Sequence, residues 1–153
     1  MRILTVRQPW AWAIIHGGKD VENRTRNIAG DYCGPIAIHA AATTLASFDP
    51  SHHDLWPFDR TKHTLGAIIG VVDLRGVHEG HNTERSQFRA VRSCFRSGKP
   101  FGPCSPWALP DHQHLELANP RPLTTPIPYK GALGLRALPD DVAREILAEM
   151  QNA

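Results

Sequence analysis

The chain is poor in cysteine, in net charge and in long apolar runs, and each shortage excludes a class of protein. Its three cysteines, Cys33, Cys94 and Cys104, follow no CxxC spacing, so the sequence predicts neither a disulfide framework nor a zinc ribbon. Seventeen Lys+Arg stand against 15 Asp+Glu, a formal net charge of +2. So small an excess does not by itself indicate a nucleic-acid partner.

Apolar runs are too short for a membrane protein. No stretch approaches the roughly 18 apolar residues that a membrane-spanning helix needs. At the N-terminus, Arg7, Gln8 and Pro9 interrupt the apolar residues before the core of a signal peptide could form. We therefore expect a cytoplasmic protein with reduced thiols and no membrane contact.

Short segments separated by proline and glycine make up most of the chain. The 13 prolines favour many turns and short elements. β-Branched residues are dense over 65–77, where Gly70 is expected at a bulge or bend. We expect one α+β domain over 1–153, a small PUA-like β-barrel of five to six strands with flanking helices. The sequence predicts strands over 3–6, 36–40, 65–77, 112–117 and 130–138, a link over 120–128, and helices over 10–16, 84–96 and from Pro139 onward.

The most specific motif lies between Leu4 and Arg24 and reads LTVRQPWAWAIIHGGKDVENR. In it a strand leads into a Gln-Pro-Trp-Ala helix, and a glycine, a lysine and a Glu-Asn-Arg strand follow. This motif resembles the signature of the ASCH domain family, in its small single-domain bacterial type. Stretches 34–40, 66–73, 119–123 and 130–134 agree with the family as well. The resemblance implies a β-barrel related to the PUA fold, a cleft beside the first helix, and RNA binding.

The polar residues of the motif are candidates for lining that cleft. Arg7 and Gln8 lie where the strand meets the helix, and Lys19 lies just past the helix end. Alternation along the next strand puts Glu22 and Arg24 on one face. A pocket rich in donors, with one carboxylate, suits a base edge or a phosphate.

Trp10 could add a stacking surface for a base. The competing interpretation is structural: Glu22 forms an internal ion pair with Arg24, Arg7 is solvated, and the tryptophans are core. For the cleft, the predicted nucleic-acid-binding residues are Arg7, Gln8, Trp10, Lys19 and Arg24.

Catalysis is an alternative that the resemblance raises. Some ASCH relatives are amidohydrolases acting on N4-acetylcytidine, and these use a lysine, a threonine three residues later and a glutamate of a later strand. The lysine matches Lys19 here, but Glu22 replaces the threonine and Asp73 the later glutamate. If the chain is an enzyme, Lys19 or Glu22 would act as a base on water and Asp73 would orient the lysine.

A second cluster of positive charge lies in the helix predicted over 84–96. Its arginines recur at i, i+4, i+7 and i+11, which places them within roughly a 60° arc of a helix. Such a row repels itself unless phosphates neutralise it, although a solvated helix face is an equal alternative. The predicted phosphate-binding residues are Arg85, Arg89, Arg92 and Arg96.

Nine histidines raise the question of a metal. They match no HExxH pattern and no Cys/His zinc spacing, so the sequence predicts no metal and no other cofactor. The function predicted is binding of RNA, expected to be single-stranded, or of a modified nucleoside. The alternatives are a hydrolase, either an amidohydrolase or a ribonuclease, and a protein-interaction module in RNA or transcription regulation.

Overall fold

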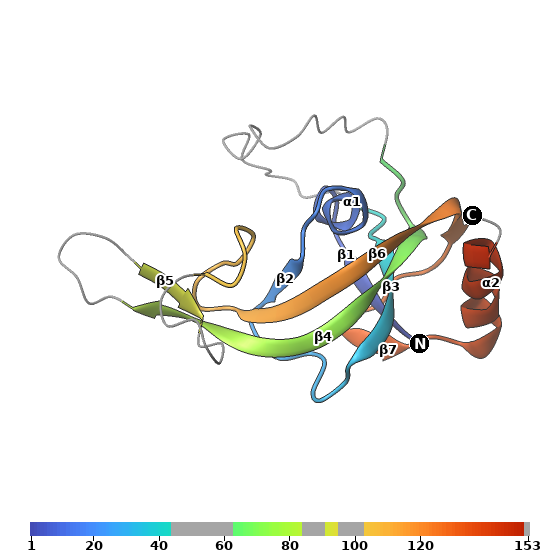
Figure 1. Cartoon of the computed structure of the whole chain (residues 1–153). Helices are drawn as coiled ribbons and strands as arrows, with labels where there is room; N and C mark the ends of the chain where they lie inside the picture. Colours follow the sequence, from blue (N-terminus) through green and yellow to red (C-terminus); the bar gives the residue numbers. More distant parts are fainter. Residues whose placement is uncertain (44–62, 84–90, 95–102, 152–153) are drawn as a thin grey trace.

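A computed structural model describes residues 1–43, 63–83, 91–94 and 103–151 (Figure 1). In this part of the chain a curled sheet forms a half-barrel with two helices, an α+β fold consistent with the predicted PUA-like barrel. The elements are β1 (Arg2–Val6), α1 (Trp10–His16), β2 (Val21–Arg24), β3 (Gly34–Ala40), β4 (Ala67–Thr83), β5 (Val91–Cys94), β6 (Gln113–Pro128), β7 (Leu135–Ala137) and α2 (Asp140–Gln151).

The strand order is β2-β6-β4-β3-β1-β7, and β5 pairs with β4 outside this path. β1 and β3 run parallel, and the other pairs are antiparallel. The register of β4 on β6 shifts between Ile68 and Gly70, which confirms the predicted irregularity at this glycine. A Cβ on Gly70 would lie 2.7 Å from both the Arg121 carbonyl oxygen and Ile15 Cδ1. Glycine therefore lets β6 and α1 approach β4 closely.

Alternation along the strands builds a core on each face of the sheet. On β1, Leu4 and Val6 join the cluster that packs under α1, which includes Ile14 of that helix. Ile3, the residue before Leu4, points to the other face and joins the second cluster, which includes Ile146 of α2. The curved sheet thus holds α1 on one side and α2 on the other (Figure 1).

Both terminal helices agree with the predictions. α1 covers the predicted residues 10–16, and Gly18, at a φ of +69°, takes the left-handed conformation after its end. α2 begins at Asp140, with Asp140 and Asp141 in its first turn, where carboxylates favour the helix dipole. No helix in the described residues has the length and apolarity to cross a membrane.

The helix predicted over 84–96 is wrong at its C-terminal end. Val91–Cys94 form the strand β5, paired with β4 from Gly80 to Thr83. Residues 84–90 and 95–96 lie outside the described residues. A strand alternates its side chains, so Arg92 cannot share a helical face with the other arginines. Pairing with β4 and the β-branched Val91 favour the strand over the helical spacing.

Two predictions near the C-terminus also need correction. The link predicted over 120–128 is the second half of β6. Strand pairing survives its prolines because the register shifts between Ala118 and Arg121, so Pro120 needs no ladder hydrogen bond. The strand predicted over 130–138 shortens to β7, since residues 130–134 form no strand and line the pocket instead.

Candidate functional site

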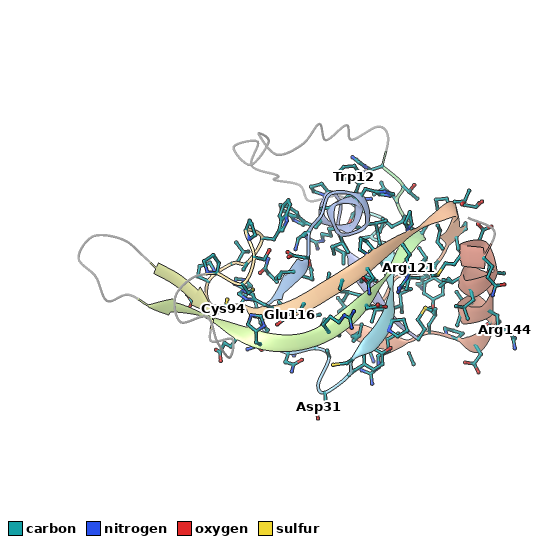
Figure 2. The ribbon with its side chains drawn as sticks, in the orientation of Figure 1. Trp12, Asp31, Cys94, Glu116, Arg121 and Arg144 are labelled. Carbon is teal, nitrogen blue, oxygen red and sulfur yellow. The ribbon has the colours of Figure 1, made fainter. Side chains whose placement is uncertain are left out.

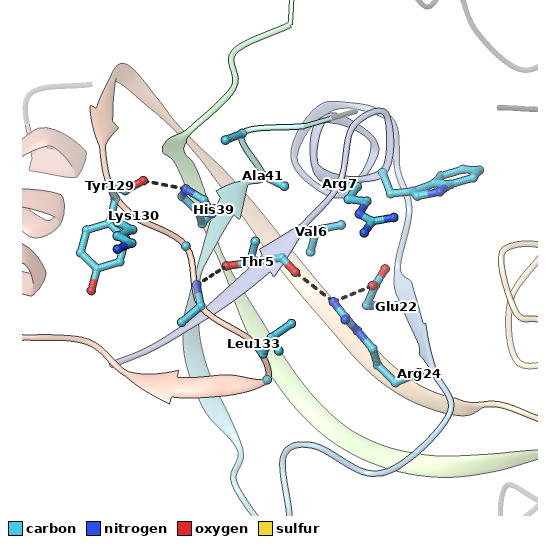
Figure 3. A pocket seen from close by; sticks show the side chains of 15 residues that line it. Thr5, Val6, Arg7, Glu22, Arg24, His39, Ala41, Tyr129, Lys130 and Leu133 are labelled. Atoms are coloured by element: carbon cyan, nitrogen blue, oxygen red, sulfur yellow. Dashed lines mark hydrogen bonds and ion pairs between the residues drawn. The ribbon is translucent and has the colours of Figure 1, made fainter. Parts of the chain in front are cut away.

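A pocket opens beside α1, between the ends of β1 and β2 and the segment that follows β6 (Figure 3). Its volume of about 660 Å³ lies in the range of small-molecule sites. Both polar side chains and apolar groups contribute to its wall. The lining residues are Thr5, Val6, Arg7, Trp10, Glu22, Arg24, His39, Ala41, Ala42, Tyr129, Lys130, Gly131, Ala132, Leu133 and Gly134.

One end of the pocket is charged. Glu22 and Arg24 point to the same face of β2, as predicted, and Arg24 Nη2 lies 3.0 Å from Glu22 Oε1. Arg24 also donates to the Thr5 carbonyl oxygen at 3.1 Å. Figure 3 shows the Glu22 carboxylate between the side chains of Arg7 and Arg24. Arg7 is exposed, so its charge is available to a ligand.

Lys19 lies behind this charged end and is only 4% exposed. Its Nζ donates to the Val21 carbonyl oxygen and lies 3.3 Å from Glu22 Oε2. Nζ also lies 5.9 Å from the centre of the Trp10 ring. Burial lowers the pKa of Lys19, and the neighbouring Glu22 carboxylate partly opposes that effect. Lys19 therefore pairs with Glu22 from the buried side, and it is not among the residues that line the described pocket.

The opposite end of the pocket is built around His39 on β3. This imidazole is 1% exposed, and its Nε2 donates to the Tyr129 carbonyl oxygen at 2.9 Å. That bond leaves Nδ1 as an acceptor, which is buried and has no hydrogen-bond partner among the described residues. Burial lowers the pKa of His39, so the ring is neutral near pH 7. His39 lies in the stretch 34–40 that agrees with the family, and it is not among the nucleic-acid-binding residues predicted from the sequence.

Trp10 lies between the pocket and a second tryptophan. Its ring meets Trp107 edge to face, with centroids 6.3 Å apart. Trp107 belongs to the loop before β6, and its indole nitrogen donates to the Gly18 carbonyl oxygen at 3.2 Å. Asn23 of β2 donates to the Trp107 carbonyl oxygen and accepts from Leu109 N, each at 2.9 Å. The loop is thus hydrogen-bonded to β2, and its Trp107 ring packs against the ring of Trp10.

Gln8 is a structural residue rather than a pocket residue. Its side chain is 1% exposed, accepts from Trp12 N at 2.9 Å and donates to the Thr64 carbonyl oxygen at 3.0 Å. The first of these bonds satisfies an amide that the start of α1 leaves without a helical partner. The predicted nucleic-acid contact by Gln8 therefore gains no support from its position.

Asp73 lies away from Lys19, in a network of its own. Its carboxylate accepts from Arg121 Nη2 at 2.6 Å and from Asn119 Nδ2 at 2.8 Å, both on β6. Hydrogen bonds from Arg121 and Asn119 lower the pKa of this carboxyl. The geometry thus gives Asp73 no contact through which it could orient Lys19, as the catalytic prediction required.

The predicted phosphate-binding arginines cannot be placed in the same way. Arg85, Arg89 and Arg96 lie outside the described residues, and of Arg92 only the backbone is described, on β5. Their contact with phosphate stays a prediction.

Comparison with known proteins agrees with this geometry. The ASCH domain model matches residues 4–127, a stretch that runs from β1 into β6 and contains the charged end of the pocket. The comparison with curated proteins gave no match. The family is generally linked to RNA binding. Because the match covers most of the 153 residues, the chain belongs to the ASCH domain family.

Proposed function

We propose that this protein binds single-stranded RNA, or a modified nucleoside, in the pocket beside α1. The observation behind the proposal is the Arg7, Glu22 and Arg24 group next to the Trp10 ring, in a cavity of about 660 Å³. A nucleoside needs a flat apolar contact, a few hydrogen-bonding groups and room for its sugar, and this pocket offers all three. The proposal places this binding in the cytoplasm, as the sequence predicts.

Each group at the charged end has a separate task in this proposal. Trp10, which is half-buried, offers an indole face to a base, and such stacking contributes about 1–3 kcal/mol. Glu22 accepts from an exocyclic amine of the base, while Lys19 and Arg24 hold its carboxylate in place through their ion pairs. Arg7 contacts the phosphate of the chain. In the proposal Arg85, Arg89, Arg92 and Arg96 stay additional phosphate contacts.

Charge reversal at the pocket tests the proposal. We expect Arg7→Glu to weaken binding of a labelled single-stranded RNA at least tenfold, measured by fluorescence anisotropy, because it replaces a phosphate contact by a repulsive charge. Arg144→Glu is the matched control. It makes the same charge change on the exposed face of α2 and should leave the affinity within twofold (Figure 2). An equal loss of RNA affinity in both variants would mean that RNA is attracted by the overall charge and not bound in the pocket.

An amidohydrolase acting on N4-acylated cytidine is the second candidate. The observation that favours it is the buried Lys19 amine, whose pKa burial lowers, 3.3 Å from Glu22. A lysine in this state is a candidate base for activating water. The positions of Glu22 and Asp73 weigh against it, because neither reproduces the pattern of the amidohydrolase relatives.

Product chromatography distinguishes the two candidates. Wild type, Lys19→Met and Lys130→Met would be incubated with N4-acetylcytidine and with a short RNA, with and without EDTA. Turnover lost in Lys19→Met and retained in Lys130→Met, which changes an exposed lysine of the pocket wall, would make the protein an enzyme. Folded wild type that binds without turnover would leave binding as the function. RNA fragments instead of cytidine would indicate a ribonuclease.

A further inference from the structure

A cluster of two cysteines and two histidines lies apart from the pocket, at the end of the sheet where β5 pairs with β4. Each of His78, Cys94, Cys104 and His114 offers one ligand atom, and these four atoms all lie within 4.8 Å of one another. The ligand residues come from β4, β5, the loop before β6, and β6. Figure 2 shows this region around the labelled Cys94 and Glu116. We propose that these four side chains bind one structural Zn²⁺ ion.

The separations between the two sulfurs and His114 fit a tetrahedral zinc site, and all four ligand atoms lie within 4.8 Å of one another. With Zn–S near 2.3 Å and Zn–N near 2.0–2.1 Å, sulfur and nitrogen ligands lie about 3.5 Å apart. Cys94 Sγ lies 3.3 Å from His114 Nδ1, and Cys104 Sγ lies 3.4 Å from the same nitrogen. A ligand set of Cys₂His₂ is a preferred set for zinc, and softer thiolates disfavour magnesium and calcium.

The second nitrogen of each histidine is oriented as in known metal sites. His114 Nε2 donates to the Leu109 carbonyl oxygen at 2.7 Å, which leaves the Nδ1 lone pair directed at the two sulfurs. His78 Nδ1 lies 2.8 Å from Glu116 Oε1. His78 Nε2 is buried and has no hydrogen-bond partner among the described residues. Metal-binding histidines commonly use one nitrogen for the metal and the other for a carboxylate or a carbonyl.

The backbone around the cluster is also arranged for it. Cys104 N donates to Cys94 Sγ at 3.4 Å, a bond that would stabilise a metal-bound thiolate. Gly80, opposite Cys94 in the strand pairing, leaves room for the His114 ring. A Cβ at Gly80 would lie 2.3 Å from His114 Cε1, so any other residue would displace this ligand. His114 and Cys94 are buried and His78 and Cys104 are half-buried, so the cluster lies mostly beneath the surface.

Four protein ligands leave no open position on the ion, so the site is structural rather than catalytic. Its effect would be to fasten the β4–β5 ribbon, which extends away from the half-barrel in Figure 1, to the loop before β6. A two-stranded ribbon is marginally stable by itself. On binding, the two thiols release their protons to solvent and coordinate as thiolates.

Metal analysis of the full chain tests the proposal. Protein purified under reducing conditions from cells supplied with zinc should contain one equivalent of zinc by plasma mass spectrometry. After chelation, titration with Co²⁺ should saturate at one equivalent and give the thiolate-to-cobalt charge transfer and the intense visible bands of a tetrahedral site. Added Zn²⁺ should displace the cobalt and raise the melting temperature of the metal-free protein.

Variants assign the ligands. Cys104→Ser and His78→Gln should lose the tetrahedral cobalt spectrum, and Glu116→Gln should bind zinc about 10- to 100-fold more weakly. Cys33→Ser is the matched control, since Cys33 is an exposed free thiol outside the cluster and should change nothing. Circular dichroism checks that each variant is folded.

The wild type alone can overturn the proposal, even if a ligand variant fails to fold. Reduced, folded wild type that takes up neither Zn²⁺ nor Co²⁺ would do so. Protein isolated without reductant that contains a Cys94–Cys104 disulfide and no metal would also overturn the zinc proposal. RNA binding is not a readout here, so failure of this proposal leaves the pocket proposal untouched.

Discussion

Gly131 lines the pocket and lies so close to His39 and Thr5 that no side chain fits at this position. A Cβ there would lie 2.6 Å from His39 Cε1 and 2.9 Å from Thr5 Oγ1. Both neighbours are held in place, His39 by Tyr129 and Thr5 by the backbone of Ala132. We expect Gly131→Ala to lower the free energy of unfolding by about 1–3 kcal/mol, because the wall must shift.

Urea unfolding of Gly131→Ala beside Gly76→Ala measures this effect. No heavy atom lies within 4 Å of a Cβ built on Gly76, so that variant should unfold at nearly the same urea concentration as wild type. Equal stability of the two variants would show that the wall adjusts without cost.

The protonation of His39 gives a second prediction at the residue scale. Its pKa in the folded protein lies below the ordinary value of about 6.5, because the ring is buried. The unfolded chain therefore takes up this proton at a higher pH than the folded chain. The stability that neutral His39 supplies is complete above about pH 6.5 and falls as the pH drops toward the folded pKa.

His39→Gln keeps a side-chain donor for the Tyr129 carbonyl oxygen but cannot titrate. We expect its free energy of unfolding to fall less than that of wild type between about pH 7 and about pH 5. Urea unfolding at a series of pH values measures both curves. Parallel curves would mean that His39 is not protonated on unfolding.

At the scale of elements, α2 packs on the half-barrel through the buried Ile146 and the half-buried Val142, Ala143 and Met150. Ile146 is 0% exposed and packs in the cluster with Ile3, Ala37 and Leu123, whereas its neighbour Leu147 is 48% exposed. We expect Ile146→Ala to cost about 2–5 kcal/mol of unfolding free energy, since the cavity would lie between helix and sheet.

Leu147→Ala removes the same number of carbon atoms from the exposed side of the helix. It should change the free energy of unfolding by less than about 0.5 kcal/mol. Thermal unfolding followed by circular dichroism compares the two. A large loss in Leu147→Ala would place a further contact on that face.

For the whole molecule, the formal net charge of +2 is too small to attract RNA by itself. Affinity in the proposed function therefore depends on a few local contacts with phosphate. Each phosphate contact predicts that RNA affinity falls about 3- to 4-fold between about 50 and about 300 mM salt. Arg7 alone would give this loss, and each of Arg85, Arg89, Arg92 and Arg96 that also contacts phosphate would multiply it by the same factor. A nucleoside without phosphate should bind in the same pocket with no such dependence.

Anisotropy for the RNA and calorimetry for the nucleoside, over the same salt series, measure the two slopes. An RNA affinity that stays constant over this range would remove the phosphate contacts from the proposal. A steep dependence for the nucleoside would show that salt acts on the protein itself.

The sequence determined most of the framework by local signals. The helix α1 is bounded by Gln-Pro-Trp at its start and by Gly17-Gly18 after its end. The strand β4 is marked by its β-branched residues, and its bulge by Gly70. The alternation of Glu22 and Arg24 placed both on the pocket side of β2. Signals of this kind need only neighbouring residues, so they can be read along the chain.

The tertiary structure alone decided which distant residues meet. It turned Val91–Cys94 into a strand, because pairing with β4 outweighs helical spacing. It directs the Gln8 side chain to a backbone amide at the start of α1 and pairs Asp73 with Arg121. It also places His39 in the pocket lining. His78, Cys94, Cys104 and His114 show the limit most clearly. They follow no ligand spacing in sequence, since four separate segments supply them and only the folded sheet brings their ligand atoms together.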